Sequence, residues 1–169
     1  MFKEFSSFAV KIIELYSKEE TKKIKESFWT TLGKYLSLIP VSDGSKVNWI
    51  NYKTGIKYLV FRMDVNYKGG VIAIEICHPD QHVRLQMLDQ FQQYALLLES
   101  ELGEKWEWNN DYIDEFGRPI IRIFKEIDGV NIFIREDWPK LISFFKPRIM
   151  GLDSFWSTAK YSFEKFKYV

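Results

Sequence analysis

Apolar residues recur at helical spacing in the first part of the chain, between residues 2 and 16 and again between residues 18 and 36. An apolar side chain that returns every three or four positions predicts an amphipathic helix in each segment. Ser17 and Glu20 have the spacing of a capping box, which places the start of the second helix. The apolar stripe expected on this second helix comprises Ile24, Phe28, Leu32 and Tyr35.

Two further helical segments are predicted later in the chain. Asp80 is a suitable N-cap for a long helix that ends at Leu102, directly before a glycine. An aromatic-rich helical region begins after Asp137. Pro147 or Gly151 is expected to kink or split it, because proline removes a backbone donor and glycine weakens a helix.

Alternation of apolar and polar residues marks residues 57–66, and apolar residues at every second position mark residues 71–77. These two segments predict a β-hairpin. With Lys68-Gly69 as the two-residue loop, Arg62 lies opposite Glu75. This register places the apolar residues of both strands on one shared face and the charged residues on the other.

Weaker strand signals occur on both sides of this hairpin. Residues 47–52 and 105–108 are candidate strands, and residues 109–117 are expected to form an acidic loop. Residues 118–127 predict a further strand, onto which residues 130–134 are expected to fold back after a turn.

Strands joined by short hairpins, with helices before and after them, indicate an α+β fold. We expect an antiparallel sheet of about four to six strands. The hairpin over residues 57–77 should be central, with helices mainly on one face and at both termini. Residues 1–169 contain no repeat and no low-complexity linker, so a single domain is expected.

Composition narrows the class of protein. Cys77 is the only cysteine, which excludes an intramolecular disulfide and a multi-cysteine zinc site. The chain start lacks the features of a signal peptide, and no apolar run reaches the ~20 residues of a membrane span. We therefore expect a cytoplasmic protein without a membrane partner. The aromatic share of 17% is high enough to indicate an extensive core or an interface.

Charge gives a less direct indication of partners. The net charge of +1 provides no overall attraction to nucleic acid or membrane. The charges are nevertheless uneven, since residues 99–115 are acidic and residues 140–169 are basic. Two such regions either steer a partner or are solvated surfaces that offset each other, and the second interpretation is favoured.

Asp64 and Glu75 are candidate catalytic residues on adjacent predicted strands. Restriction-type nucleases use such a pair to hold a divalent metal, normally with a lysine two residues after the second acid. Cys77 occupies that position here. Glu75 also faces Arg62 in the predicted register, so an ordinary cross-strand ion pair is the favoured interpretation and no metal site is assigned.

His78 is a third catalytic candidate, four residues before His82. Two histidines at this spacing on one helix face bind zinc, and one of them can act as a general base. Because Pro79 separates them, we instead expect both to be exposed at a strand–helix junction. Cys77 is expected to pack as a small buried hydrophobe and not to act as a nucleophile.

The basic C-terminal region contains the candidate nucleic-acid contacts Lys146, Arg148, Lys160 and Lys165. They alternate with aromatic residues, which suits binding to a phosphate backbone with stacking on bases. An amphipathic helix with lysines on its outer face has the same pattern, and it fits the nearly neutral chain better.

Several stretches together resemble an uncharacterised bacterial family, domain of unknown function 4268. They are SKEET, ESFWTTLGKYLS, NWINYKTGIK, FRMD, IEICHPD, IRIFKE, EDWPKLISFFKPRI and LDSFWSTAKYSFE, which cover nearly everything after Tyr16. The resemblance implies a compact module, found alone or attached to nuclease-like domains, and it supplies no catalytic residues. Residues 1–16 lie outside its clearest part.

These observations favour a non-catalytic module that binds a protein partner or self-associates and needs no cofactor. The alternative is a nucleic-acid-binding or nuclease-like protein linked to DNA restriction or defence, which would use a divalent metal.

Overall fold

The computed structural model describes residues 16–40 and 45–169. Its helices are α2 (Lys18–Leu36), α3 (Gln81–Gln93), α4 (Ala95–Leu102) and α5 (Trp138–Ala159), with 3-10 turns η1 (Arg135–Asp137) and η2 (Lys160–Phe166) on either side of α5. Its strands are β1 (Leu59–Val65), β2 (Gly69–Ile76), β3 (Glu107–Ile113) and β4 (Pro119–Asp128). The helix expected over residues 2–16 lies outside the described residues.

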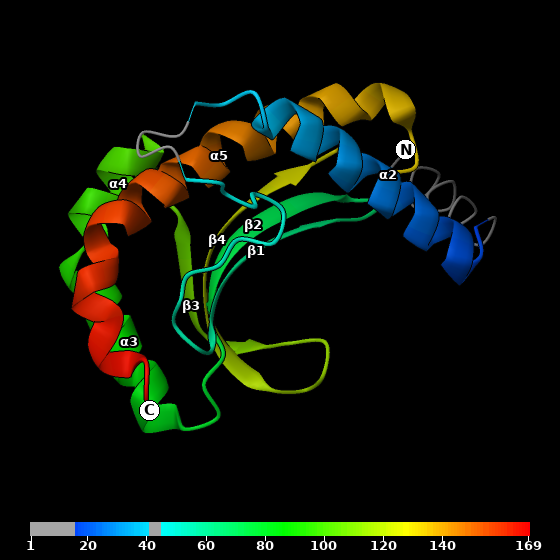
Figure 1. Cartoon of the computed structure of the whole chain (residues 1–169). Helices are drawn as coiled ribbons and strands as arrows, with labels where there is room; N and C mark the ends of the chain where they lie inside the picture. The colour runs from blue at the N-terminus through cyan, green and yellow to red at the C-terminus, as the bar shows by residue number, and fades with distance from the viewer. Residues whose placement is uncertain (1–15, 41–44) are drawn as a thin grey trace.

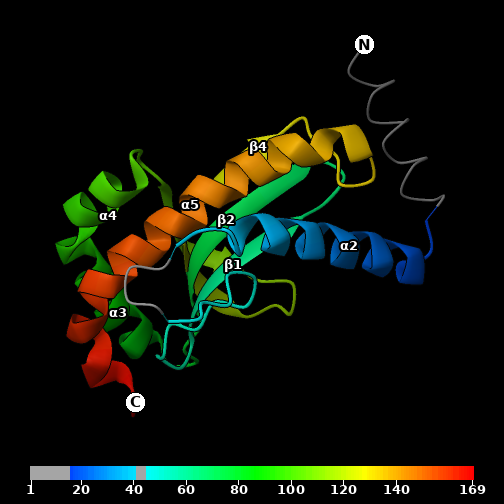
Figure 2. The same ribbon diagram turned by 45° about the horizontal axis from the view of Figure 1, so that its top comes forward.

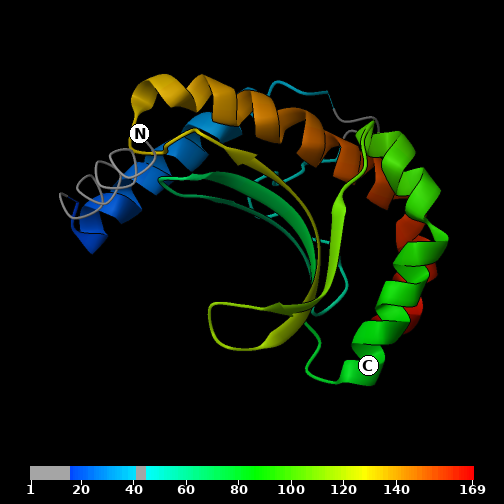
Figure 3. The ribbon, with the colours of Figure 1, turned by 180° about the vertical axis from the view of Figure 1, so that it is seen from behind.

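The strands form one open antiparallel sheet in the order β1-β2-β4-β3, which confirms the α+β prediction. The sheet is strongly curved, and the described helices lie along its convex side (Figures 1 and 3). α2 and α5 cross the same face of β1 and β2 (Figure 2). None of the described helices combines the length and apolar character that a membrane crossing requires.

The hydrophobic core fills the space between the convex face and the helices. Ile72, Ile74 and Ile76 point into it from β2 and are fully buried, as the alternation along this strand predicts. Aromatic rings supply much of the remaining volume. Phe91 of α3 stacks near Phe155 of α5, with ring centroids 6.1 Å apart. The aromatic excess of the sequence is therefore largely a property of the core.

The hairpin forms as predicted, but its register is different. β1 and β2 pair Arg62 with Ala73 and Val65 with Gly70, so the loop is residues 67–68 and the predicted register, with Arg62 directly opposite Glu75, is wrong. The predicted ion pair between Arg62 and Glu75 nevertheless forms, between diagonal neighbours. The Asn66 side chain sets this turn, because its Oδ1 accepts hydrogen bonds from the amides of residues 68 and 69 at 2.8 and 3.1 Å. A shift of two residues leaves every side chain on its predicted face.

α2 has the predicted bounds and the predicted capping box. The Ser17 hydroxyl accepts from the Glu20 amide, and the Glu20 carboxylate accepts from the Ser17 amide. Phe28 and Leu32 are buried as expected, whereas Tyr35 is 50% exposed and its predicted place in the stripe is wrong.

The predicted boundaries of the later helices need two corrections. The long helix expected from Asp80 to Leu102 is broken at Tyr94, whose hydroxyl hydrogen-bonds Ser162 of η2. α5 instead runs unbroken through Pro147 and Gly151. Gly151 is required by close packing, because a Cβ there would lie 2.9 Å from the Glu101 carbonyl oxygen of α4. This contact keeps α4 and α5 close together.

Three strand assignments are also wrong. Residues 47–52 form no strand and contain a turn at residues 50–51, where the Asn48 side chain accepts a hydrogen bond from the Asn51 amide. The segment expected to be an acidic loop, residues 109–117, instead continues β3 as far as Ile113 and pairs with β4 through a bulge. Residues 130–134 do not fold back as a strand.

Candidate functional site

The concave face of the sheet carries no described helix, and the β3–β4 hairpin projects beyond its end (Figure 3). The register fixes which side chains lie on it, because side chains alternate between the two faces of a strand. The charged members of this concave face are Arg62 and Asp64 of β1, Glu75 of β2, Glu107 of β3, and Arg122, Glu126 and Asp128 of β4. Carboxylates therefore outnumber guanidinium groups by five to two.

Glu75 lies at the centre of this face and is 4% exposed. Its Oε1 accepts a hydrogen bond from the Arg62 Nε at 2.5 Å, and its Oε2 lies 3.2 Å from the Arg122 Nε. Burial works against the Arg62 charge, but the hydrogen bond and the attraction of Glu75 prevail and raise the pKa of Arg62. Both carboxylate oxygens are thus held by arginines.

Arg122 is the more deeply buried of the two arginines, at 8% exposure. Its guanidinium carbon lies 4.5 Å from the centroid of the Tyr112 ring and 5.6 Å from that of Phe124. The Nε atom is buried and makes no hydrogen bond of good geometry, although Glu75 is close enough for an ion pair. Glu75 therefore balances the Arg122 charge mainly through electrostatic attraction between the two nearby groups, and not through a hydrogen bond from Nε.

Asp64 and Glu75 share the concave face but do not form a pair. Asp64 lies opposite Val71, four residues from Glu75 along β2. At ~3.3 Å per residue, this separates the two positions by about 13 Å along the strand. Asp64 instead lies 3.5 Å from Lys25 of α2. Within residues 16–40 and 45–169, no three His, Cys, Asp or Glu side chains gather as metal ligands would.

Glu107, Glu126 and Asp128 form the acidic end of the concave face, along β4. All three are exposed. Glu107 lies opposite Phe124, beside Glu126, and Asp128 follows two residues further along the same strand. In the described part of the chain none of these three carboxylates has a cationic partner within ion-pair distance. Glu107 and Glu126 are diagonal neighbours across β3 and β4, and carboxylates gathered without a counter-charge repel one another, so this acidic end is a candidate site for a cationic group of a partner.

His78 is buried, at 8% exposure, so the expectation that it is exposed is wrong. Its Nδ1 accepts a hydrogen bond from the Asp80 amide at 3.0 Å, and its ring meets Tyr58 edge-on. The Arg84 side chain covers the junction by donating to the His78 carbonyl oxygen at 2.7 Å. His82 is exposed, as expected. The two histidines therefore have different environments and do not face one site.

Cys77 is half-buried next to the concave face. Burial raises the pKa of its thiol to about 11, and the nearby Glu75 carboxylate acts in the same direction. The thiolate is the nucleophilic form of cysteine, so this environment opposes covalent catalysis at neutral pH.

We expect iodoacetamide to modify Cys77 about two hundredfold more slowly at pH 8 than it modifies a free thiol of pKa ~8.5, because the thiolate fraction is that much smaller. The rate should keep rising up to about pH 11. Mass spectrometry follows a single adduct, since the chain has one cysteine. A rate that levels off near pH 8 would show an ordinary thiol.

The basic nucleic-acid candidates do not form one surface. Arg148 donates to both carboxylate oxygens of Glu104, at 2.7 and 3.1 Å. Lys165 donates to the Gln90 side chain at 2.8 Å, while Lys146 is half-buried. Arg148 and Lys160 are twelve residues apart, about 18 Å along a helix. The acidic and basic segments of the chain thus partly neutralise each other within the fold.

Arg122 was not among the candidates derived from the sequence. A signal for it was present, because one charged residue interrupts the apolar run Ile120–Phe124. A charge inside such a run indicates either an edge strand or a buried ion pair. The partner could not be chosen, since Glu75 is brought opposite Arg122 only by the pairing of β2 with β4.

Comparison with known proteins gives a family and no closer relative. Neither the curated proteins nor the solved structures provide a match. The family model described as Domain of unknown function (DUF4268) matches residues 24–160, and this range includes the whole sheet and α5. The chain therefore belongs to the family of domain of unknown function 4268.

Proposed function

We propose that this protein is a non-catalytic interaction module that binds a basic segment of a partner protein on the concave face of its sheet. The observation that carries the proposal is the acidic end formed by Glu107, Glu126 and Asp128, three exposed carboxylates without a cationic partner in the described chain. Uncompensated charge on an open face attracts and orients a partner of opposite sign.

The rest of the concave face supports binding more than chemistry. Glu75 has an arginine at each oxygen, and the Cys77 thiol has a raised pKa. The His78 Nδ1 accepts a backbone hydrogen bond. Glu75 and His78 are thus engaged in contacts that hold the fold, and the environment of Cys77 disfavours its thiolate, whereas the carboxylates at the acidic end are available to a ligand.

The proposal is tested by fluorescence anisotropy with a labelled peptide that alternates lysine and valine. Its acidic counterpart, duplex DNA and single-stranded RNA serve as competing probes. We expect the lysine peptide alone to bind, with an affinity that falls as salt increases. Reversing three charges with Glu107→Lys, Glu126→Lys and Asp128→Lys should weaken binding about tenfold, from about 0.5 kcal/mol for each exposed ion pair.

A matched control reverses three exposed carboxylates elsewhere, with Asp89→Lys, Glu101→Lys and Glu136→Lys. These residues lie on α3, α4 and η1, and the net charge of the control equals that of the test variant. Equal loss of binding in both variants would contradict a role for the concave face. Binding of DNA or RNA in place of the peptide would favour a nucleic-acid-binding function.

A further inference from the structure

β4 is longer than the strand that covers it. β3 begins at Glu107, opposite Phe124, so its ladder with β4 stops there. β4 continues to Asp128 and remains paired with β2 along its other side. Residues 125–128 therefore pair with β2 on one side, while no strand of the described chain pairs with their other side, which we call the free edge. Such an edge is a template for an added strand.

The direction of the backbone groups along this free edge follows from the hairpin turn. The Asn66 amide donates to the Gly69 carbonyl oxygen, so the peptide groups of Gly69 face β1 and those of Gly70 face β4. Gly70 pairs with Ile127, whose own groups therefore face β2. The amides and carbonyls of Glu126 and Asp128 consequently point towards the free edge.

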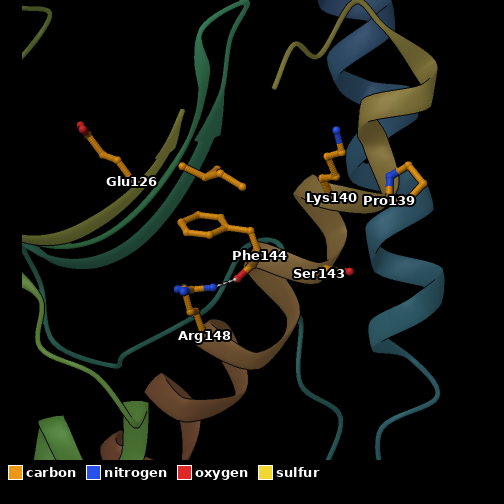
Figure 4. A pocket seen from close by; sticks show the side chains of 7 residues that line it. Glu126, Pro139, Lys140, Ser143, Phe144 and Arg148 are labelled. Atoms are coloured by element: carbon orange, nitrogen blue, oxygen red, sulfur yellow. Dashed lines mark hydrogen bonds between the residues drawn. The ribbon is translucent and has the colours of Figure 1, made fainter. Parts of the chain in front are cut away.

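A groove of about 560 Å³ runs beside this edge, between β4 and the first half of α5. Ile127 and Phe144 form its apolar part, with Pro139 and Ser143 further along α5. Figure 4 shows the Phe144 ring turned towards β4, while Glu126 points to the opposite side of the strand. Arg148 closes one end of the groove, where Glu104 neutralises its charge.

We infer that a partner segment adds to the sheet as a strand along residues 125–128, with basic residues opposite Glu126 and Asp128 and an apolar residue between them. The apolar residue would lie on the groove side, against Ile127 and Phe144. Side chains of a strand alternate between its two sides, so this edge selects alternation of basic and apolar residues. The inference rests on the proposed function and specifies its ligand.

A second copy of this chain is a poor occupant of the same edge. Two copies that pair antiparallel about Ile127 place Glu126 of one opposite Asp128 of the other, on the same face. Like charges directly opposite each other are destabilising. The carboxylates of Glu126 and Asp128 thus oppose pairing of two copies along this edge. The same carboxylates attract a segment that carries lysine or arginine.

Backbone methylation of the peptide distinguishes strand addition from simple charge attraction. In the inferred geometry the lysines lie opposite Glu126 and Asp128, so their amides face β4 and the valine amides face solvent. The probes are two labelled Lys-Val-Lys-Val-Lys peptides, one N-methylated at its second and third lysines and the other at its two valines. We expect the lysine-methylated peptide to bind at least tenfold more weakly than the valine-methylated peptide.

The protein itself offers a matched pair of variants. Glu126→Pro removes the carboxylate and the edge amide, whereas Glu126→Ala removes only the carboxylate. Proline is tolerated at an edge position whose amide faces outward. The proline variant should bind the unmethylated peptide about tenfold more weakly than the alanine variant. Circular dichroism verifies that both variants fold. If the proline variant does not fold, the comparison of the two methylated peptides with the native protein still tests the inference.

The outcomes separate the two proposals. Equal binding of the two methylated peptides, together with loss of binding on charge reversal, overturns strand addition and leaves the basic-partner function standing. Failure of every lysine peptide to bind overturns both. A preference for the valine-methylated peptide supports the inference directly.

Discussion

Replacing Glu75 with alanine is expected to lower the free energy of unfolding by about 3 kcal/mol. The carboxylate is 4% exposed and lies against the Arg122 guanidinium, which is 8% exposed. Without Glu75 the Arg122 charge remains buried with no counter-charge, and breaking one side of a buried ion pair costs far more than losing an exposed one. Urea unfolding followed by tryptophan fluorescence measures the change, and Tm should fall by about 9 °C.

Three comparisons show whether burial of the Arg122 charge is the cause. Glu107→Ala removes an exposed carboxylate of the same face and should change stability by less than about 0.5 kcal/mol. Arg62→Ala leaves the Glu75–Arg122 pair in place and should cost less than about 1 kcal/mol, because Arg62 is exposed. The double variant Glu75→Leu, Arg122→Met removes both charges and should recover most of the lost stability. A Glu75→Ala variant within 1 kcal/mol of the native protein would contradict this account.

The fold class was predictable because local signals agreed with one another. The capping box of Ser17 and Glu20, the helical spacing after it and the alternation in β1 each depend on neighbouring residues only. The face of every hairpin residue also followed from alternation. These signals sufficed to predict an antiparallel sheet with helices packed against it, even where individual strands were assigned wrongly.

The helix errors arose where tertiary contacts override local preference. Nothing near Tyr94 in the sequence ends a helix, and the break coincides with a hydrogen bond to Ser162, 68 residues away. Gly151 is a weak helix former, yet α5 continues through it. Glycine is needed at this position because α4 packs too closely for any side chain. Local propensity cannot contain information about a partner so distant in the chain.

The candidate site was predictable in part. Arg62 and Glu75 were expected to pair, and they do, but as diagonal neighbours and not as directly opposed residues. The acidic end needed knowledge of the strand order, since Glu107 and Glu126 become neighbours only when β3 pairs with β4. The free edge of β4 exists because β3 begins only at Glu107, directly after the buried Trp106. Nothing about this tryptophan in the sequence indicates that a strand begins there.

Gly69→Ala tests the hairpin register and is expected to destabilise the protein by about 3 kcal/mol, the upper range for overpacking. A Cβ at Gly69 would lie 1.7 Å from the Ile127 carbonyl oxygen and 3.2 Å from the Asp128 Cα. These are backbone atoms of the adjacent strand, which cannot move away without separating β2 from β4. Thermal unfolding by circular dichroism measures the loss.

The neighbouring glycine supplies the control. A Cβ at Gly70 meets side-chain atoms, Phe145 Cζ at 2.9 Å and Leu141 Cδ2 at 3.2 Å, which can shift. Gly70→Ala should therefore cost about 1 kcal/mol. In the register with Lys68-Gly69 as the loop, Gly69 would be a turn residue, and alanine there would also cost about 1 kcal/mol. Equal losses of stability for the two substitutions would support the register with Lys68-Gly69 as the loop. A larger loss for Gly69→Ala would support the observed register, in which Gly69 lies close to the β4 backbone.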